Sequence, residues 1–116
     1  MNLDDYSFHD SIILRVIEHT DKKSVDYYID FPIIWENNLF KKRILRFTDV
    51  FTHIIEEIPF AGNPSILEII NHGQIEKTFG KGRNKFKHKT NKIEIRTNAG
   101  IRIIEFTNCD LLKIEE

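Results

Sequence analysis

The chain has 116 residues, of which 41% are hydrophobic and 30% charged, and its formal net charge is −1. These values are ordinary for a globular protein with one hydrophobic core, so we expect a single domain over residues 1–116. The apolar runs are too short for a membrane-spanning helix, and the N-terminus has acidic residues where a secretory signal has basic ones. We therefore expect a cytoplasmic protein without a membrane segment.

Two N-terminal strands are predicted after a polar lead-in over residues 1–10. The segment 24–35 alternates apolar and polar side chains with period two, which is typical of a half-buried antiparallel strand. Its expected inner face holds Val25, Tyr27, Ile29 and Phe31, and its outer face holds Asp26, Tyr28 and Asp30.

An apolar strand over residues 12–17 precedes this segment and is expected to pair with it as a hairpin. If the numbers of paired residues sum to 41, Arg15 faces Asp26, which places opposite charges together. In the same register the apolar pairs are Val16 with Val25, Leu14 with Tyr27, and Ile12 with Ile29. One register thus satisfies both faces of the hairpin.

The middle of the chain is less clearly patterned. Pro32 cannot donate a ladder hydrogen bond and should end the second strand, and Trp35 in the following loop should close one end of the core. A further strand is predicted over 39–47. Residues 47–58 have apolar side chains at helical spacing, but their β-branched and aromatic composition favours a strand, so the pattern leaves both structures open.

The second half should begin with a short helix over Ser65–His72, because Asn63-Pro64 provides an N-cap and a first-turn proline and Gly73 can end a helix. A buried strand is the alternative. Later strands are predicted over 74–79, 92–97, 101–106 and 111–114, with a glycine turn at 80–82 and a hairpin turn at 98–100. The overall prediction is a mainly-β antiparallel domain, sandwich-like or a partly open barrel, with one or two short helices.

Candidate catalytic groups are few. The histidines form no HxH or HExxH pattern, and the chain lacks phosphate-binding and nucleophile motifs. His9 and Asp10 are adjacent, but neighbours in an extended chain point to opposite sides, so a local backbone hydrogen bond from Asp10 or Ser11 is the favoured interpretation. Asp26 and Asp30 could form a carboxylate pair, although a solvated strand face is favoured.

The sequence thus predicts no enzyme, no cofactor and no metal site. Cys109 is the only cysteine, which excludes an intrachain disulfide and a thiolate-rich zinc site, and we expect a buried, unreactive thiol.

A basic segment carries the main candidate binding residues. Between Lys77 and Ile93 the chain has seven Lys or Arg residues and no acid, which leaves 10 basic and 18 acidic residues elsewhere. Interleaved cations and an aromatic ring suit binding to a nucleic-acid strand. The simpler alternative is a solvated edge strand whose lysines prevent aggregation. A third possibility is binding to a protein partner of opposite charge. The candidate partner-binding residues are Lys81, Arg83, Lys85, Phe86, Lys87 and Lys89.

Several short motifs in the first half carry a family resemblance. They are Tyr6-Ser7-Phe8-His9-Asp10-Ser11, Tyr28-Ile29-Asp30, Trp35 and Leu45-Arg46-Phe47-Thr48-Asp49-Val50. With this F-H-D-S start and L-x-F-x-[DN]-V segment, the chain resembles a broad group of small uncharacterised bacterial proteins, some of which are thought to be immunity proteins encoded beside polymorphic toxins. The resemblance implies a mostly-β domain, a strand after Phe47, and a binding protein rather than an enzyme, and it transfers no catalytic residue.

The expected function is therefore that of a non-catalytic cytoplasmic binding protein with a protein partner, of the immunity type that neutralises a toxin. The alternative is a nucleic-acid-binding module that uses the basic segment 77–93.

Overall fold

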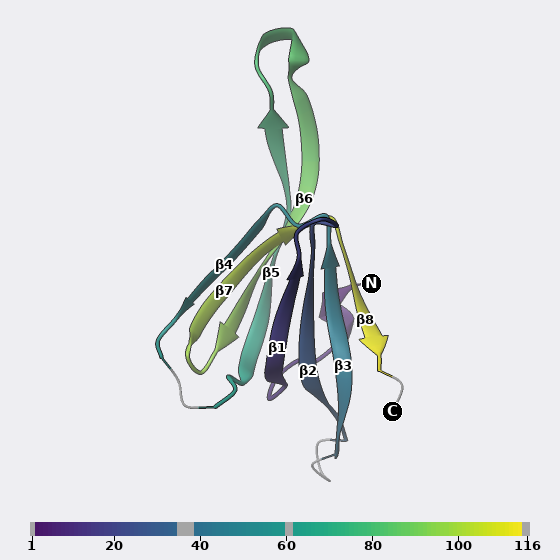
Figure 1. Cartoon of the computed structure of the whole chain (residues 1–116), viewed down its shortest axis with the longest axis vertical. Coiled ribbons are helices and arrows are strands. Elements are labelled where there is room, and N and C mark those ends of the chain that lie inside the picture. Colours follow the sequence, from purple (N-terminus) through teal and green to yellow (C-terminus); the bar gives the residue numbers. More distant parts are fainter. Residues whose placement is uncertain (1, 35–38, 60–61, 115–116) are drawn as a thin grey trace.

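The computed structural model of the chain describes residues 2–34, 39–59 and 62–114. These residues form two four-stranded antiparallel sheets that face each other (Figure 1). Sheet A has the order β1 (Ile12–His19), β2 (Ser24–Ile34), β3 (Leu39–Thr48), β8 (Asn108–Lys113). Sheet B has the order β4 (Thr52–Glu57), β7 (Gly100–Phe106), β6 (Phe86–Thr97), β5 (Ile66–Phe79).

The predicted mainly-β, sandwich-like architecture is thus confirmed. The helices found in the described ranges are single 3-10 turns, η1 (Leu3–Asp5) and η3 (Gly82–Asn84). Neither has the length and apolar character that crossing a membrane requires.

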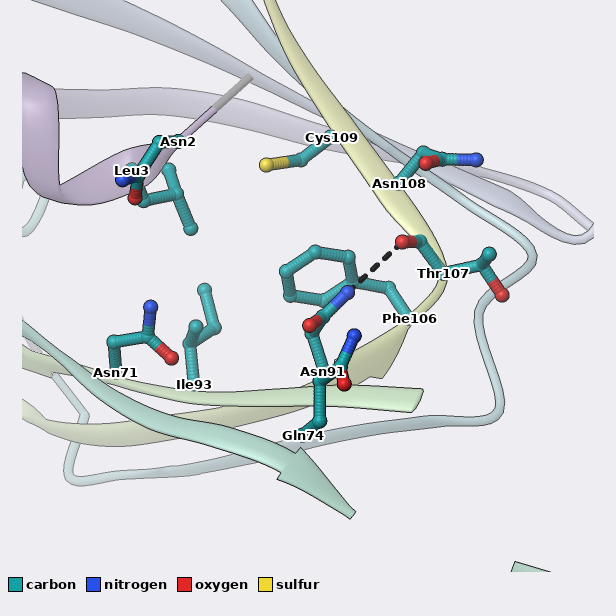
Figure 2. A pocket seen from close by; sticks show the side chains of 10 residues that line it. All are labelled: Asn2, Leu3, Asn71, Gln74, Asn91, Ile93, Phe106, Thr107, Asn108 and Cys109. Atoms are coloured by element: carbon teal, nitrogen blue, oxygen red, sulfur yellow. Dashed lines mark hydrogen bonds between the residues drawn. The ribbon is translucent and has the colours of Figure 1, made fainter. Parts of the chain in front are cut away.

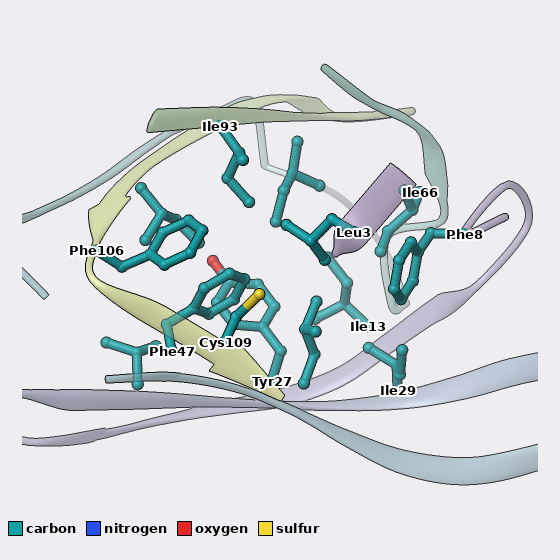
Figure 3. Packing of buried hydrophobic residues seen from close by; sticks show 14 residues of the cluster. Leu3, Phe8, Ile13, Tyr27, Ile29, Phe47, Ile66, Ile93, Phe106 and Cys109 are labelled. Carbon is teal, nitrogen blue, oxygen red and sulfur yellow. The ribbon is translucent and has the colours of Figure 1, made fainter. Parts of the chain in front are cut away.

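The core fills the space between the two sheets (Figure 3). The predicted inner face of β2 is confirmed, since Tyr27 and Ile29 are completely buried. Phe47 of sheet A packs edge-on against Tyr27 and against Phe106 of sheet B, with ring centroids 5.9 and 4.9 Å apart. The predicted polar lead-in also contributes to the core, because Leu3 and Phe8 are buried in it.

The two sheets are joined at a corner, formed by residues 48–52 and 105–108. The β3–β8 ladder ends at the pair Thr48↔Asn108, and the β4–β7 ladder starts at Thr52↔Glu105. Backbone hydrogen bonds across the corner, including Phe51 N–H to the Glu105 carbonyl at 2.8 Å, keep the two chain segments side by side. Asp49 has a φ of 51°, a left-handed conformation that Asp tolerates better than most residues.

The predicted β1–β2 register is wrong. The turn closes at His19↔Ser24, so paired numbers sum to 43 near the turn, and Val16 rather than Leu14 lies opposite Tyr27. A bulge between Ile13 and Arg15 then changes the register by one residue, which keeps both Ile13 and Val16 packed in the core.

The expected ion pair between Arg15 and Asp26 is replaced by two other contacts. Arg15 lies opposite Tyr28, with its guanidinium carbon 4.1 Å from the ring centroid, as in a cation–π contact. Asp26 instead accepts hydrogen bonds of 2.7 and 3.0 Å from Arg46 of β3.

The prediction that Pro32 ends the second strand is wrong. β2 continues to Ile34, with an irregularity in the β2–β3 register directly after Pro32. A ladder can tolerate proline at such an irregularity, because one missing donor then breaks no regular pair. The predicted roles of Trp35 and its loop lie outside the described residues.

The predicted helix over Ser65–His72 is also wrong, and its alternative, a strand, is observed. Ser65 forms an isolated bridge with Ile12, and the Ile66 N–H donates a 2.7 Å hydrogen bond to the Ser11 carbonyl. Ile66 is completely buried, so pairing and burial of this β-branched residue outweigh the local capping signal.

Other elements follow the predictions. The ambiguous segment 47–58 contains strand β4, and β6 and β7 form the predicted hairpin around Asn98-Ala99-Gly100. Gly100 is required there, because a Cβ atom would collide with the Glu56 carbonyl oxygen.

Two ion pairs whose carboxylates have little exposure, Asp26 with Arg46 and Glu57 with Arg102, should make stability depend on pH. Hydrogen bonds from Arg46 lower the pKa of Asp26 below 3.8, and those from Arg102 lower the pKa of Glu57 below 4.5. Groups with depressed folded-state pKa values contribute stability above the unfolded values and lose it as the pH falls through the folded values. We expect urea titrations to show an unfolding free energy that is steady near neutral pH and falls below pH 4.5.

A matched pair of variants tests the Asp26 contribution. The Asp26 side chain is 1% exposed, so Asp26→Asn should lower the unfolding free energy at neutral pH by about 1–3 kcal/mol and weaken its acid dependence. Asp21→Asn, in the exposed turn, should change it by less than about 0.5 kcal/mol. An unchanged acid profile in Asp26→Asn would contradict this assignment.

Candidate functional site

β5 and β6 extend well beyond the other strands of sheet B. The β6–β7 ladder ends at Asn91↔Phe106, whereas β5 and β6 stay paired from Gln74↔Asn91 to Phe79↔Phe86. We call this ribbon with its turn, residues 74–91, the basic arm. It projects from the sandwich in Figure 1 and accounts for the long axis of a molecule that measures 58 × 30 × 26 Å. Six residues on each strand give it a length of about 20 Å.

A bulge marks the base of the arm. Between Asn71 and Gly73 the register shifts so that β5 contains one residue more than β6. Gly73 has a φ of 81°, and its N–H donates a 2.8 Å hydrogen bond to Asn71 Oδ1. Bulges bend a strand and increase its twist. Gly73 therefore helps to direct the arm out of the sandwich instead of ending a helix.

The tip of the arm is a tight turn that contains η3. Gly80 has a φ of 86°, and a Cβ atom at this position would collide with the backbone carbonyl oxygen of Asn84. The predicted glycine turn is thus in place, and glycine at position 80 is a steric requirement.

The structure brings all the predicted partner-binding residues together on the outer part of the arm. Lys87 and Lys89 lie on one face of β6, whereas Lys85 directly precedes the strand. The exposed side chains are those of Lys81, Arg83, Lys85, Phe86, Lys87 and Lys89.

The charge of the arm differs from that of the sandwich. The arm contains six Lys or Arg residues and one acid, Glu76, so the rest of the chain carries 11 basic and 17 acidic residues. Lys87 Nζ lies 3.4 Å from Glu76 Oε1, an exposed contact of the kind that contributes little stability. The ribbon is therefore strongly basic and the sandwich acidic.

The tip also presents an aromatic side chain. Phe86 is 60% exposed and lies between Lys85 and Lys87 in the sequence. Between Asn91 and the tip of the arm, the outer edges of the ribbon pair with no other strand in the described ranges. Their backbone groups therefore remain open to a partner.

Contacts at the base of the arm were not predicted. The His88 ring packs on Phe51 of the corner with centroids 4.9 Å apart, and its Nε2 lies 3.4 Å from Thr107 Oγ1. Asn91 Nδ2 donates a 2.9 Å hydrogen bond to the Thr107 carbonyl. These residues come from distant parts of the chain, and no local sequence pattern connects them.

Strand β4 starts beside this base and carries an apolar surface. It is an edge strand of sheet B, and its outer side chains do not enter the core. The large exposed apolar residues on and next to it are Phe51, Ile54, Ile55 and Ile58.

The candidate acid–base residues lie elsewhere. His9 and Asp10 do approach each other, with Nε2 and Oδ1 3.6 Å apart, because Asp10 has a φ of 67° and is not extended. His9 Nδ1 lies 2.7 Å from the Leu67 carbonyl oxygen. A local backbone hydrogen bond is present at Ser11, whose N–H donates to the Phe8 carbonyl at 2.9 Å, but the Ser11 Oγ is buried with no hydrogen-bond partner in the described chain.

Asp26 and Asp30 do not behave as a solvated pair. Asp26 is buried against Arg46, and His19 Nε2 lies 3.3 Å from its carboxylate. Cys109 is buried as predicted, and burial raises the pKa of its thiol to about 11. Over residues 2–34, 39–59 and 62–114, His, Cys, Asp and Glu side chains form no cluster suited to a metal ion.

The sequence did not predict one polar chain, which runs from the exposed Glu18 into the interior at Tyr27. The Tyr27 hydroxyl lies 2.7 Å from His53 Nε2, and His53 Nδ1 lies 2.9 Å from Glu18 Oε1. With a neutral ring, Tyr27 donates to His53, which donates to the carboxylate. Tyr27 is completely buried, and burial raises its pKa to about 12, so this chain links the sheets without exposing a nucleophile.

Comparison of the chain with protein-family models, curated proteins and solved structures finds no match. The function is therefore inferred from the geometry and charge of the basic arm.

The arm should be separable from the sandwich. Replacement of residues 76–89 by Asn-Gly joins Ile75 to Thr90, which lie opposite each other, through a favoured two-residue hairpin turn. The buried core cluster contains no residue of the arm, so we expect a folded protein that loses at most about 1–2 kcal/mol of unfolding free energy. Circular dichroism and urea titration measure this, and an unfolded product would show that the sandwich depends on the arm.

Proposed function

We propose that this chain is a non-catalytic cytoplasmic binding protein that inserts its basic arm into an acidic surface of a protein partner. In its most concrete form, it is an immunity-type protein that neutralises a toxin by covering the toxin's active surface. The observation that carries the proposal is the arm itself, an exposed ribbon of roughly 20 Å with six cations and one acid.

Charge supports an acidic protein partner. Opposite potentials on two surfaces accelerate encounter and fix orientation. A basic ribbon on an acidic sandwich would orient toward a carboxylate-lined cleft, with the sandwich kept at the rim. The phosphate backbone of a nucleic acid would also attract the arm, but it would repel the acidic sandwich where the sandwich meets the base of the arm.

The other exposed groups of this region also suit a protein partner. The open edges of the ribbon can accept a strand of the partner by backbone pairing. Phe86 supplies an aromatic anchor at the tip, and aromatic residues are enriched at protein interfaces. Ile54 and Ile55 add exposed apolar area on β4, the edge strand that follows Phe51.

Toxin neutralisation requires only that an active surface be covered. A ribbon can enter a cleft that a flat sheet face cannot reach, and its tip can block substrate access while the sandwich excludes solvent around it. The resemblance of the first half to proteins thought to be immunity proteins supports this form of the proposal, and the arm lies outside the resembling motifs. In this form of the proposal, a protein with a different arm sequence would neutralise a different toxin.

Nucleic-acid binding is the second candidate, favoured by Phe86 between two lysines. A two-stranded ribbon fits the DNA major groove, and an exposed aromatic side chain can stack on a base. Binding of this kind weakens steeply as salt rises.

The decisive test compares two triple variants with identical charge changes. Lys81→Glu, Arg83→Glu and Lys85→Glu reverse the charge at the tip of the arm. Lys41→Glu, Lys42→Glu and Arg43→Glu reverse the charge on a part of β3 where the two lysines are exposed and Arg43 is half-buried. We expect the tip variant to bind the protein partner on the order of 100-fold more weakly, because each reversed charge should cost about 1 kcal/mol of binding free energy. The β3 variant should bind as the unchanged protein does.

The partner is obtained by affinity capture from the native host with nuclease treatment, and its affinity is measured by calorimetry with the purified partner. Suppression of the partner's toxicity by the unchanged protein, but not by the tip variant, is the functional measurement. Recovery of nucleic acid alone, with salt-sensitive binding, would favour the second candidate. Equal binding by both triple variants would show that the arm binds neither a protein partner nor a nucleic acid.

A further inference from the structure

A cavity of about 350 Å³ lies at the base of the basic arm, between sheet B, β8 and η1 (Figure 2). Its apolar part consists of Leu3, Ile93, Phe106 and Cys109, which also belong to the core. Around them stand the carboxamides of Asn2, Asn71, Gln74 and Asn91. The volume lies within the range of small-molecule sites.

The lining of this cavity carries no formal charge. Its remaining side chains are those of Thr107 and Asn108, and the Cys109 thiol stays protonated at neutral pH because burial raises its pKa to about 11. Such a lining offers hydrogen bonds but carries no charge of its own, and the Asp4 carboxylate beside it accepts a 3.4 Å hydrogen bond from Asn71 Nδ2. The part of a ligand that enters must therefore be polar and uncharged.

Three of the carboxamides are held in place by the main chain. Asn91 Nδ2 donates to the Thr107 carbonyl at 2.9 Å, and Asn71 Oδ1 accepts from Gly73 N–H at 2.8 Å. Asn2 Oδ1 accepts from Asp4 N–H at 3.0 Å. Gln74 makes no hydrogen bond within the described chain, so its donors and acceptor are available. Fixed polar groups favour ligand binding, because less side-chain freedom is lost.

We propose that this carboxamide cavity binds the base of a nucleotide. A nucleobase combines apolar faces with an edge of alternating donors and acceptors. The Gln74 side chain presents a matching donor and acceptor, as in the bidentate contact of glutamine with adenine. The Phe106 ring and Ile93 provide the apolar contact area.

The arm provides a place for the phosphate. Lys89 lies two residues beyond Asn91 on the same face of β6, about 7 Å further along the strand. Glu76, opposite Lys89, is engaged by Lys87, and Lys89 has no ion pair within the described ranges. A phosphate attached to a base in the cavity would thus meet an available cation.

The test is an NMR titration of the ¹⁵N-labelled full chain with each of the four ribonucleoside monophosphates at millimolar concentration. We expect at least one of them to shift the side-chain amide signals of Asn71, Gln74 and Asn91. Ribose 5-phosphate, which has the phosphate but no base, should leave these signals unchanged. The corresponding nucleoside should bind more weakly than the monophosphate.

Two variants and one control variant identify the site without disturbing the core. Gln74→Leu should weaken binding about tenfold or more, the cost of a lost bidentate contact. Asn84→Leu, which changes an exposed carboxamide at the tip of the arm, should leave the affinity unchanged. Lys89→Ala should weaken binding of the monophosphate but not of the nucleoside.

The source of the base is distinguished with short single-stranded oligonucleotides. Binding at least tenfold tighter than that of any monophosphate would identify a nucleic-acid strand, and equal or weaker binding a free nucleotide. No amide shift with any of the four monophosphates would overturn the proposal, as would an equal response to ribose 5-phosphate. The Lys81, Arg83 and Lys85 variant leaves the cavity intact, so failure here is distinct from failure of the protein-partner proposal.

Discussion

The corner at residues 48–52 and 105–108 is the constraint on which the rest of this structure depends. Two neighbouring antiparallel chain segments cross between the sheets here, 48–52 from sheet A to sheet B and 105–108 from sheet B to sheet A, and backbone hydrogen bonds keep them paired through the bend. This arrangement places the apolar faces of the two sheets opposite each other, so that Phe47 on one side reaches Phe106 on the other. It also places Phe51 beneath His88, at the base of the arm. One bend thus positions both the core and the binding element.

The strands were largely predictable because a half-buried strand repeats every two residues. The inner face of β2 and the β6–β7 hairpin follow directly from that alternation. The register between strands was not predictable. The β1–β2 turn closes at His19↔Ser24, two residues away from the predicted register, and bulges near Leu14 and at Asn71–Gly73 change the pairing by one residue without interrupting the apolar pattern. The segment 65–72 carries true helix-end signals, which the pairing and burial of Ile66 outweigh.

The candidate sites also differ in whether they could be predicted from the sequence. The basic segment could be recognised because its residues are contiguous, although nothing in the sequence indicated that it leaves the sandwich as a ribbon. The carboxamide cavity could not be recognised, since Asn2, Asn71 and Asn91 meet only through the tertiary fold. The same holds for the chain from Glu18 through His53 to Tyr27. Such clusters depend on sheet packing, and single asparagines or histidines are common on strand ends and turns.

The separation of the arm from the core affects how such a protein can change over evolutionary time. Substitutions within residues 76–89 leave the packing between the sheets untouched, so this stretch is free to diversify while the sandwich stays under selection for folding. Recombination that exchanges only this ribbon would give a new recognition element on an old framework. Position 80 is an exception, because its backbone geometry requires glycine whatever the surrounding sequence. Rapid change of the sequence around a fixed glycine at position 80 would be the record of such a history.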